Sequence, residues 1–293
     1  MSFTKEMTVK QVLDLNPKTA EVFRKLGMHC LGCPSAVGET VAGAARTHNL
    51  DLNLLLQELN GIEYGELSPE AMAEAMPEGA IIQKDKEHFA IVPHLPGGLV
   101  DPGTLRRIAE VAEKYGCAAI KLTSAQRLAL VGLKKEDVPK AWEDLGMKPG
   151  AAHGNRVRNI KFCPGDAFCI RGEQDAINLG MALDARYHGM ELPAKMKMAV
   201  SGCPRKCTDA SSVDIGVVGT ATGYMLLVGG CGGIKPRQGR MLAEGLSKEE
   251  VLGLVERIVG YFREHGELNE RLGNHIVRVG WEAFKEAVLT KEA

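Results

Sequence analysis

Four cysteines in two tight pairs constrain this chain more than any other feature of its sequence. Cys163 and Cys169 enclose five residues, Cys203 and Cys207 enclose three, and a proline follows the first cysteine of each pair. Pairs this close converge on one centre only if each lies on a short turn. The proline suits such a turn because it fixes φ and removes a backbone donor. The spacing therefore predicts one metal centre held by two turns.

The same spacing ranks the possible occupants of that centre. Four thiolates are the usual ligands of a cubane iron–sulfur cluster, which is the favoured interpretation. Structural zinc also takes four thiolates, but its cysteine pairs are separated by about two to four residues, so the five-residue gap counts against zinc. A disulfide remains the third alternative. Cys117 and Cys231 have no partner at ligand spacing, and we expect them to be small packing residues.

The residues around the cysteines resemble the siroheme and [4Fe-4S] motif of the sulfite and nitrite reductase family. The resemblance rests on the run from Ala199 to Cys207, on Arg158-Asn159 before the first pair, and on Lys195-Met-Lys197 before the second. It extends from about residue 81 to the C-terminus. It implies siroheme and a [4Fe-4S] cluster as cofactors. It also implies the four ligands of the cluster, with the last bridging it to the siroheme iron: Cys163, Cys169, Cys203 and Cys207.

The resemblance also assigns a substrate and cofactor site. Arg158, Lys195 and Lys197 would bind a small anion during its reduction, and His94 is a further catalytic candidate. The expected siroheme contacts, besides the bridging Cys207, are Thr123, Gln126, Arg127, Asn159, Arg205, Gly232 and Gly233. The last two lie in a glycine-rich turn that a large planar cofactor or another backbone can approach closely.

Two positions depart from the family pattern. The family usually has arginine where this chain has His94, before Leu-Pro-Gly-Gly, and again where it has Ala125, before Gln126. Arg127 lies two residues after Ala125, so on a strand it would point to the same face and could replace the missing guanidinium. His94 can donate a proton or carry charge, although it could equally be an ordinary loop histidine.

Basic residues gather around the cysteine pairs and the glycine turn, although the net charge of the chain is only −1. Siroheme carboxylates and an oxyanion substrate both need fixed cations, whereas the plainer interpretation is a solvated basic face. Lys195 and Lys197 are two apart on a presumed strand over residues 195–200, so both ammonium groups should project to one side. An anion between them would lower the energy of the doubly protonated state.

The chain as a whole excludes several classes of function. A net charge of −1 gives no global field for nucleic acid or an anionic membrane. Eight cysteines without an apolar N-terminal leader indicate a reducing compartment, so we expect a cytoplasmic protein. The most apolar run, residues 213–234, contains Asp214 and many glycines and indicates strands and turns rather than a membrane span.

The expected fold class is α+β, in three parts. Residues 1–60 form a small all-α domain, with a helix expected over residues 35–46 that includes Glu39, and residues 61–78 form a linker. Residues 79–150 resemble a ferredoxin-like half-domain. Residues 151–293 form the siroheme and cluster domain, with a helix over residues 174–188, strands over 213–219 and 224–228, and helices over 248–264 and 281–289.

The N-terminal part resembles a small helical domain of unknown function that accompanies redox enzymes. It carries Cys30-x-x-Cys33 at a turn that begins a helix, where the helix dipole favours a thiolate. A redox dithiol, buried structural cysteines and a metal shared between two subunits are the three interpretations. The sequence assigns no role among them.

The function implied is six-electron reduction of sulfite to sulfide, with reduction of nitrite to ammonia as the close alternative. No dinucleotide fingerprint and no additional ferredoxin-type cysteine run is present, so electrons should come from a separate ferredoxin or flavoprotein. Larger family members resemble two fused copies of this arrangement, so a homodimer with composite sites is expected. A siroheme-binding electron carrier or redox sensor is the alternative from another class.

Overall fold

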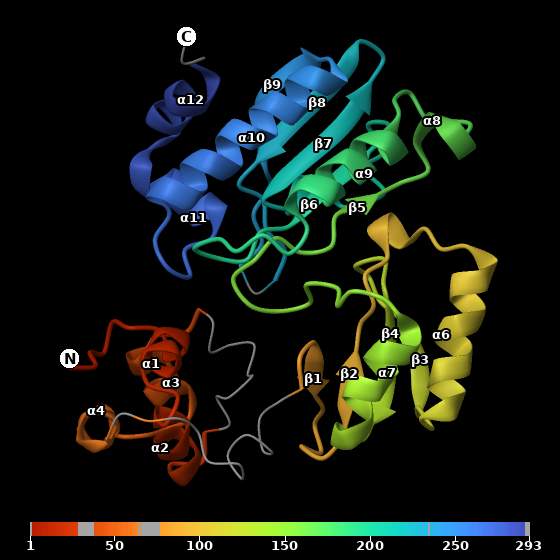
Figure 1. Ribbon diagram of the computed structural model, residues 1–293. Helices are drawn as coiled ribbons and strands as arrows, with labels where there is room; N and C mark the ends of the chain where they lie inside the picture. Colours follow the sequence, from red (N-terminus) through yellow and green to blue (C-terminus); the bar gives the residue numbers. More distant parts are fainter. Residues whose placement is uncertain (1, 29–37, 64, 66–76, 234, 291–293) are drawn as a thin grey trace.

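The computed structural model describes residues 2–28, 38–63, 65, 77–233 and 235–290. Separate hydrophobic cores form in an N-terminal helical unit, around a four-stranded sheet and around a five-stranded sheet (Figure 1). The fold therefore belongs to the mixed α+β class, as the sequence predicts. Among the described residues no helix has the length and apolar character needed to cross a bilayer.

Short capped helices build the N-terminal unit. The Thr8 hydroxyl accepts from the Gln11 backbone N–H at the start of the first helix, which is a capping box. Val12, Phe23 and Leu55 are fully buried between the helices. The helices are α1 (Val9–Leu15), α2 (Thr19–Lys25), α3 (Val41–Thr47) and α4 (Leu52–Gly61).

One helix prediction in this unit is wrong at its start. The expected helix over residues 35–46 begins only at Val41, so Glu39 lies outside it. The reason is local, because the Thr40 hydroxyl accepts from the Gly43 backbone N–H at 3.1 Å and makes Thr40 the N-cap. Cys30 and Cys33 lie outside the described residues, so their three interpretations stay open.

The second unit is an antiparallel sheet in the order β1-β2-β4-β3, covered by two helices. Its elements are β1 (Ala80–Ile82), β2 (Phe89–Ile91), η2 (Pro96–Gly98), α6 (Pro102–Lys114), β3 (Ala119–Leu122), β4 (Leu128–Leu133), η3 (Lys135–Asp137) and α7 (Val138–Leu145). Ile108, Leu130 and Ala141 are fully buried between the sheet and the helices. Every residue of the edge strand β3 is exposed.

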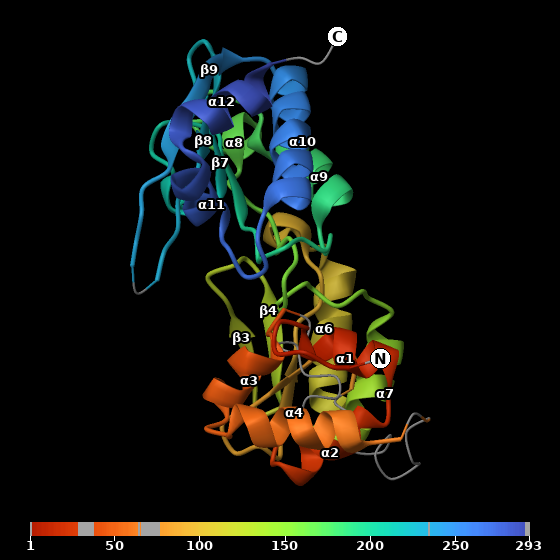
Figure 2. The ribbon, with the colours of Figure 1, turned by 90° about the vertical axis from the view of Figure 1, so that its left-hand side faces the viewer.

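The third unit is a sheet in the order β5-β6-β7-β8-β9 with helices α9 and α10 on one face (Figure 1). Its elements are β5 (Lys161–Phe162), α8 (Gly165–Phe168), α9 (Ala176–Tyr187), β6 (Met198–Ser201), η4 (Ala210–Ser212), β7 (Ile215–Thr220), β8 (Gly223–Val228), β9 (Arg240–Leu246), α10 (Lys248–His265), α11 (Leu272–Val279) and α12 (Trp281–Leu289). The loop between β8 and β9 extends away from the sheet (Figure 2).

The sequence did not predict β9 or α11, and it placed the start of β6 too early. In β9 only Leu242 is buried, so this edge strand lacks the alternation that marks a half-buried strand. Helix α11 has no side-chain N-cap. The strand expected from Lys195 starts at Met198, because before it only Met196 makes an isolated bridge, to Val157.

Strand direction in the third unit decides where its loops meet. Strands β5, β6 and β7 run parallel to one another. Strand β8 is antiparallel to β7, and β9 is antiparallel to β8. The carboxyl ends of β5 and β6 therefore open at the same edge of the sheet, one strand apart. The two cysteine pairs follow these two strand ends.

Candidate functional site

The two cysteine turns are joined directly. Cys163 comes immediately after β5, and Cys203 comes two residues after β6. The Gly202 backbone N–H donates to Cys163 Sγ at 3.1 Å. Because the two strands are parallel neighbours, the turns lie side by side at one sheet edge, as two turns that share a centre must.

Glycines let the backbones of these turns approach one another. Between the turns, a Cβ on Gly202 would lie 2.7 Å from the Gly165 Cα; within the first turn, a Cβ on Gly172 would lie 2.3 Å from the Gly165 carbonyl carbon. Gly165 itself has φ of +56°, which only glycine adopts readily. The turns are therefore packed backbone to backbone, and a side chain at these positions would push them apart.

All four cysteines of the two turns are free thiols. Cys203 is buried, Cys163 is half-buried, and Cys169 and Cys207 are exposed. Within the described ranges no three or more His, Cys, Asp or Glu side chains are arranged closely enough to hold a metal ion. The donor set still fits a cluster chemically, since four thiols lie on two contacting turns and one sulfur already accepts a backbone N–H. The four-thiolate centre stays a prediction.

A cavity of about 540 Å³ opens between the second and third units. The β3–β4 turn supplies one wall, and the segments before β5 and β6 supply another. Five of its lining side chains are cationic. The lining residues are Thr123, Ser124, Ala125, Arg127, Ala152, Arg158, Asn159, Lys161, Lys195, Lys197, Met198, Asp209, Ser212, Val213 and Gly232.

Arg127 lines this cavity and has two unmet donors. Its Nε and Nη1 atoms are buried and have no hydrogen-bond partner among the described residues. Burial lowers the pKa of Arg127 below its ordinary value. A buried guanidinium without an acceptor is unfavourable, so an anion in the cavity would remove that cost. This is the feature of the site that most directly indicates an anionic ligand.

Arg158 contributes charge rather than free donors. Its Nη1 donates to the Ala151 carbonyl at 3.1 Å and its Nη2 donates to the Gly154 carbonyl at 2.9 Å. Burial, and then the nearby charges of Arg127 and Arg156, lower the pKa of Arg158 to about 10. The guanidinium is therefore fixed by backbone and adds a rigid positive charge to the wall.

Lys195 and Lys197 both line the cavity, while Met196 between them is fully buried. Burial lowers the pKa of Lys197, and the charges of Arg271 and Lys195 lower it further. A lysine whose ammonium form is disfavoured in this way gives up its proton more readily than one in water. The pair can therefore hold an anion and donate protons to it.

Lys161 is the fifth cation of the lining. Its Nζ pairs with Asp209 Oδ2 at 2.7 Å, and only 15 % of its side chain is exposed. Asp209 follows Cys207 by two residues. This ion pair therefore connects the second cysteine turn to the cavity wall.

The predicted siroheme contacts of the β3–β4 turn divide into two groups. Thr123 and Arg127 line the cavity, whereas Gln126 does not. The Gln126 side chain donates from Nε2 to the Phe162 carbonyl at 2.9 Å and accepts the Phe162 N–H through Oε1 at 3.0 Å. Gln126 thus ties this turn to β5, the strand that carries Cys163.

Arg127 reaches the same cavity as Ala125, but not by strand alternation. Gln126 has a left-handed φ of +56°, and the Thr123 N–H donates to the Arg127 carbonyl at 2.8 Å. These residues form a tight turn, so the argument from a shared strand face is wrong. The turn nevertheless places Arg127 in the lining beside Ala125, where the family pattern has an arginine.

The remaining predicted residues lie in different places. Asn159 lines the cavity with Oδ1 buried and unpartnered, while its Nδ2 donates to the Leu95 and Ala125 carbonyls. Gly232 also lines the cavity. Gly233 has φ of +121°, and Arg205 is exposed on the second cysteine turn; neither is part of the lining.

His94 does not line the cavity. Its Nε2 lies 2.8 Å from Asp184 Oδ2 on α9, and its ring stacks on His188 with centroids 3.5 Å apart. Burial and the neighbouring His94 lower the pKa of His188 to about 4. The structure therefore gives His94 partners that join the second unit to the third, rather than a place facing the anion.

Sequence reasoning missed Asp209, Ser212 and the buried pair Asp214–Arg271 behind the lysines. Asp209 and Ser212 belong to none of the motifs used in the sequence analysis. Asp214 did carry a signal, because it is an acidic residue inside the most apolar run of the chain. A buried carboxylate needs a partner, and Arg271 supplies it from a loop far away in the sequence.

Family models match the chain in three successive parts. The nitrite and sulphite reductase 4Fe-4S domain matches residues 153–293, the nitrite/sulfite reductase ferredoxin-like half domain matches residues 81–148, and a domain of unknown function matches residues 3–56. The assimilatory-type sulfite reductase of Nitratidesulfovibrio vulgaris is 43% identical over 213 residues, which cover 73% of this chain and 98% of that protein.

This chain belongs to the nitrite and sulfite reductase family. It is an oxidoreductase of that family, whose members use siroheme and a [4Fe-4S] cluster. The NAD(P)H nitrite reductase of Bacillus subtilis is 44% identical over 201 residues, and the chain spans only 25% of that longer protein.

Two solved structures share the fold. Dissimilatory sulfite reductase I aligns with a TM-score of 0.63 at 16% identity, covering 70% of each chain. The NirA protein of Mycobacterium tuberculosis aligns with a TM-score of 0.60 at 20% identity, covering 75% of this chain and 41% of that one. At these identities the likeness concerns the architecture.

Proposed function

We propose that this chain reduces sulfite to sulfide with six electrons, at a siroheme coupled to a [4Fe-4S] cluster through Cys207. The observation that carries the proposal is the cavity that brings Arg127, Arg158, Lys195 and Lys197 together. The similarity to an assimilatory-type sulfite reductase over nearly the whole of that protein supports sulfite as the substrate.

The residues present would hold the two cofactors in defined ways. Cys163, Cys169, Cys203 and Cys207 would ligate the cluster, and Arg127, Thr123, Asn159 and Gly232 would contact the siroheme. When bound, these groups supply the one-electron steps and the iron on which the anion is reduced. The remaining chemistry, which is anion binding and proton delivery, belongs to side chains of this chain.

The cationic wall would perform both of those tasks. Arg127 offers unpaired guanidinium donors to an oxyanion, and Arg158 adds charge that is fixed by two backbone carbonyls. Conversion of hydrogen sulfite to hydrosulfide and three waters consumes six protons along with the six electrons. Lys195 and Lys197 would deliver these protons as the S–O bonds break, helped by the lowered pKa of Lys197. The fixed cations would also stabilise charge on each leaving oxygen.

Nitrite reduction to ammonia at the same site is the second candidate, favoured by the 44% identity to an NAD(P)H nitrite reductase. Steady-state turnover with each anion and a reduced viologen donor distinguishes the two. We expect the higher kcat/KM with sulfite. Siroheme absorption without turnover of either anion would instead indicate an electron carrier or redox sensor.

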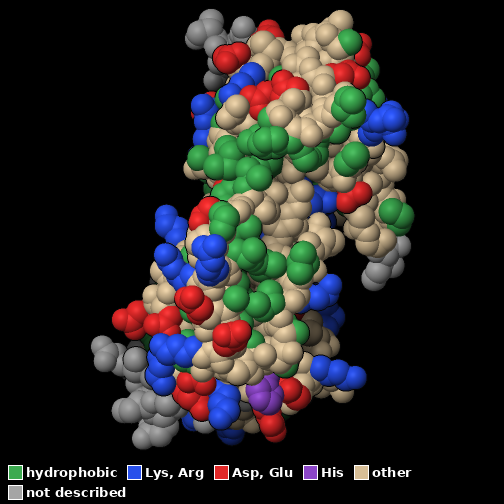
Figure 3. All heavy atoms as spheres, turned by 90° about the vertical axis from the view of Figure 1, so that its right-hand side faces the viewer, with side chains coloured by type: hydrophobic (Ala, Val, Ile, Leu, Met, Phe, Trp, Pro, Cys, Tyr) green, Lys and Arg blue, Asp and Glu red, His purple; other side chains and the backbone are tan. Residues whose placement is uncertain are grey.

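We also propose that the electrons come from a separate ferredoxin or flavoprotein and that two copies of the chain associate. Exposed apolar side chains support a partner surface: Leu122 is 73% exposed on the edge strand β3, and Phe168 and Ile170, on either side of Cys169, are 80% and 101% exposed. Figure 3 shows hydrophobic side chains across the face that carries α6 and α8. Sedimentation of the holoprotein tests the homodimer, and a fully active monomer would contradict it.

A further inference from the structure

The segment that carries the two cavity lysines lies just before β6 and outside its regular ladder. In residues 193–197 Met196 makes an isolated bridge to Val157, and the Lys197 carbonyl accepts the Ile215 backbone N–H at 3.2 Å. Two like charges on such a segment repel each other and would favour its displacement. These backbone contacts leave the Lys197 N–H and the Pro193 end of the segment to be fixed by other groups.

The first of these contacts is a buried carboxylate behind Lys197. Asp214 Oδ2 accepts the Lys197 backbone N–H at 2.8 Å, and the Asp214 side chain is completely buried. Arg271 donates from Nε to Oδ1 at 2.9 Å and from Nη2 to Oδ2 at 2.5 Å. The carboxylate thus receives three donors, and a bidentate guanidinium fixes its orientation.

The second contact holds the other end of the segment. The Asn269 backbone N–H donates to the Pro193 carbonyl at 2.8 Å. Asn155 Nδ2 donates to the same carbonyl at 2.9 Å and to Asn269 Oδ1 at 2.8 Å. Asn269 and Arg271 belong to one loop, residues 266–271, so a single loop contacts both ends of the lysine segment.

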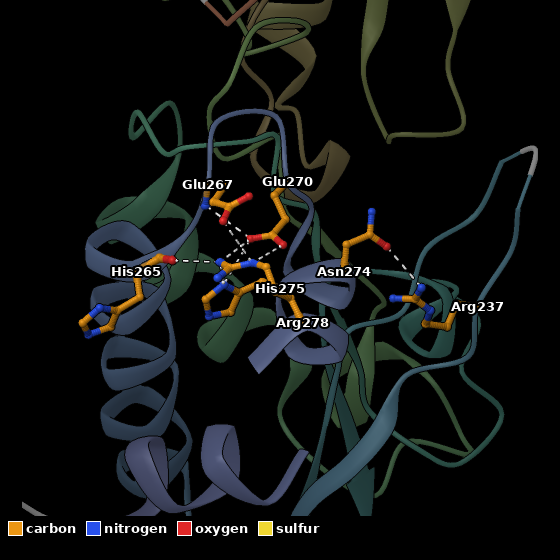
Figure 4. Close-up of polar contacts among 7 residues, drawn as sticks. All are labelled: Arg237, His265, Glu267, Glu270, Asn274, His275 and Arg278. Atoms are coloured by element: carbon orange, nitrogen blue, oxygen red, sulfur yellow. Dashed lines mark hydrogen bonds and ion pairs between the residues drawn. The ribbon is translucent and has the colours of Figure 1, made fainter. Parts of the chain in front are cut away.

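That loop is itself fixed to the two helices it connects (Figure 4). Arg278 on α11 forms a bidentate pair with Glu270, with both N–O distances 2.8 Å, and Arg278 Nη2 also donates to the His265 carbonyl at the end of α10 at 3.1 Å. His275 lies buried beside the pair, with Nδ1 3.2 Å from Glu270 Oε2. The loop between α10 and α11 therefore has little freedom.

We propose that Asp214 and Arg271 are positioning residues for the cavity lysines. The loop of residues 266–271 holds Pro193 at one end of the segment, and through Arg271 and Asp214 it holds Lys197 at the other. With the backbone fixed at both ends, alternation turns Lys195 and Lys197 toward the cavity and Met196 into the core. Neither positioning residue lines the cavity.

The role in anion reduction rests on the proposed function, whereas the backbone contact can be tested without it. The decisive comparison uses two double variants of the full chain, Asp214→Asn with Arg271→Met and Asp214→Leu with Arg271→Met. Both remove the two buried charges, and asparagine and leucine are similar in size. Only the asparagine variant keeps an oxygen that can accept the Lys197 N–H.

Hydrogen exchange of the Lys197 amide, measured by mass spectrometry with residue-level fragmentation, is the readout that does not depend on activity. We expect exchange about tenfold faster in the leucine variant than in the asparagine variant. We also expect the KM for sulfite to be about tenfold higher in the leucine variant than in the asparagine variant, with a smaller difference in kcat. Equal Lys197 exchange in the two variants would overturn the proposal.

A conservative pair keeps the test informative if the leucine variant does not fold. Arg271→Lys retains the charge but loses the bidentate contact, and Arg263→Lys makes the same change on an exposed position of α10. Faster Lys197 exchange and a raised KM in Arg271→Lys alone would support the positioning role. Wild-type values in Arg271→Lys would overturn it. Failure of the wild-type holoprotein to reduce either anion would remove the proposed function and leave the exchange result standing.

Discussion

The Gly202 backbone N–H donates to Cys163 Sγ at 3.1 Å, so the second cysteine turn contacts the first before any metal is considered. Gly202 also lies where a Cβ would be 2.7 Å from the Gly165 Cα. One glycine therefore sets both the sulfur contact and the spacing of the turns.

Gly202→Ala should separate the two cysteine turns. We expect destabilisation by about 1–3 kcal/mol and loss of most iron and acid-labile sulfide, because the added methyl group has no room. Gly260→Ala is the matched control, since its Cβ would meet nothing within 4 Å on helix α10 and should stabilise the helix by about 0.5–1 kcal/mol. Full cluster content in Gly202→Ala would show that the close packing at Gly202 is not needed for cluster assembly.

Cys207→Ser should remove the link between the cluster and the siroheme. The purified protein should lose its siroheme absorption or shift it strongly, and turnover of sulfite should vanish, because a serine oxygen is a poor ligand for these metals. Cys117→Ser, at a half-buried thiol in the second unit, should leave both readouts unchanged. Absorption, iron content and activity that all survive Cys207→Ser would contradict the bridging role.

Arg127→Gln should weaken anion binding more than it affects folding. The buried Nε and Nη1 atoms have no hydrogen-bond partner in the part of the chain that the structure describes, so their removal costs no hydrogen bond there. The KM for sulfite should rise by about tenfold to a hundredfold. Arg127→Lys should restore little of the anion binding, because an ammonium group lacks the planar set of donors of a guanidinium. The exposed Arg106→Gln on α6 is the control for a lost charge. An unchanged KM in Arg127→Gln would remove this residue from the site.

Lys197 should set the alkaline limit of activity. Burial and the charges of Arg271 and Lys195 lower its pKa from the ordinary 10.5, so the ammonium form is lost at a lower pH than for a lysine in water. Activity should fall as pH rises through that lowered value. Lys197→Arg should shift the fall in kcat/KM to higher pH, since a guanidinium stays protonated. Identical alkaline limbs for the two proteins would exclude Lys197 as the titrating group.

The Glu270–Arg278 pair should make the free energy of unfolding depend on pH in the acid range. Arg278 lowers the pKa of Glu270 from 4.5 to about 2. Its contribution, about 1–2 kcal/mol, should be fully present above the unfolded-state value and be lost as pH falls from about 4.5 toward 2. Denaturant unfolding of wild type and Glu270→Gln should therefore differ at pH 7 and converge toward pH 2. A constant difference across this range would mean that the carboxylate charge is not what stabilises the loop.

The sequence carried much of the secondary structure through local signals. Apolar runs located β7 and β8, and helical periodicity located α9, α10 and α12, each close to its observed bounds. Elements without such signals, the exposed edge strand β9 and the short helix α11, were missed. The start of α3 was misplaced because Thr40, whose hydroxyl accepts the Gly43 N–H, is the N-cap.

Some residues of the candidate site could likewise be named from the sequence, and others only from the structure. Lys195 and Lys197 were named from the resemblance to the reductase family, and their two-residue spacing put both ammonium groups on one side. Asp214 and Arg271 could not be paired from the sequence, because they are 57 positions apart and no local pattern predicts a contact between them. His94 was expected at the anion, and only the structure shows its contact with Asp184.

By itself the sequence determined which chemistry the chain can hold: two cysteine pairs at fixed spacing, a lysine pair with period two, and glycines at the turns, all of which depend on residues close together in the chain. Only the tertiary structure decided which of these features meet. Parallel β5 and β6 bring the two cysteine turns to one edge, and the β3–β4 turn brings Arg127 to the cavity that Lys197 also lines. The physical reason is that strand direction and loop packing are set by hydrophobic contacts between distant segments, which no local pattern encodes.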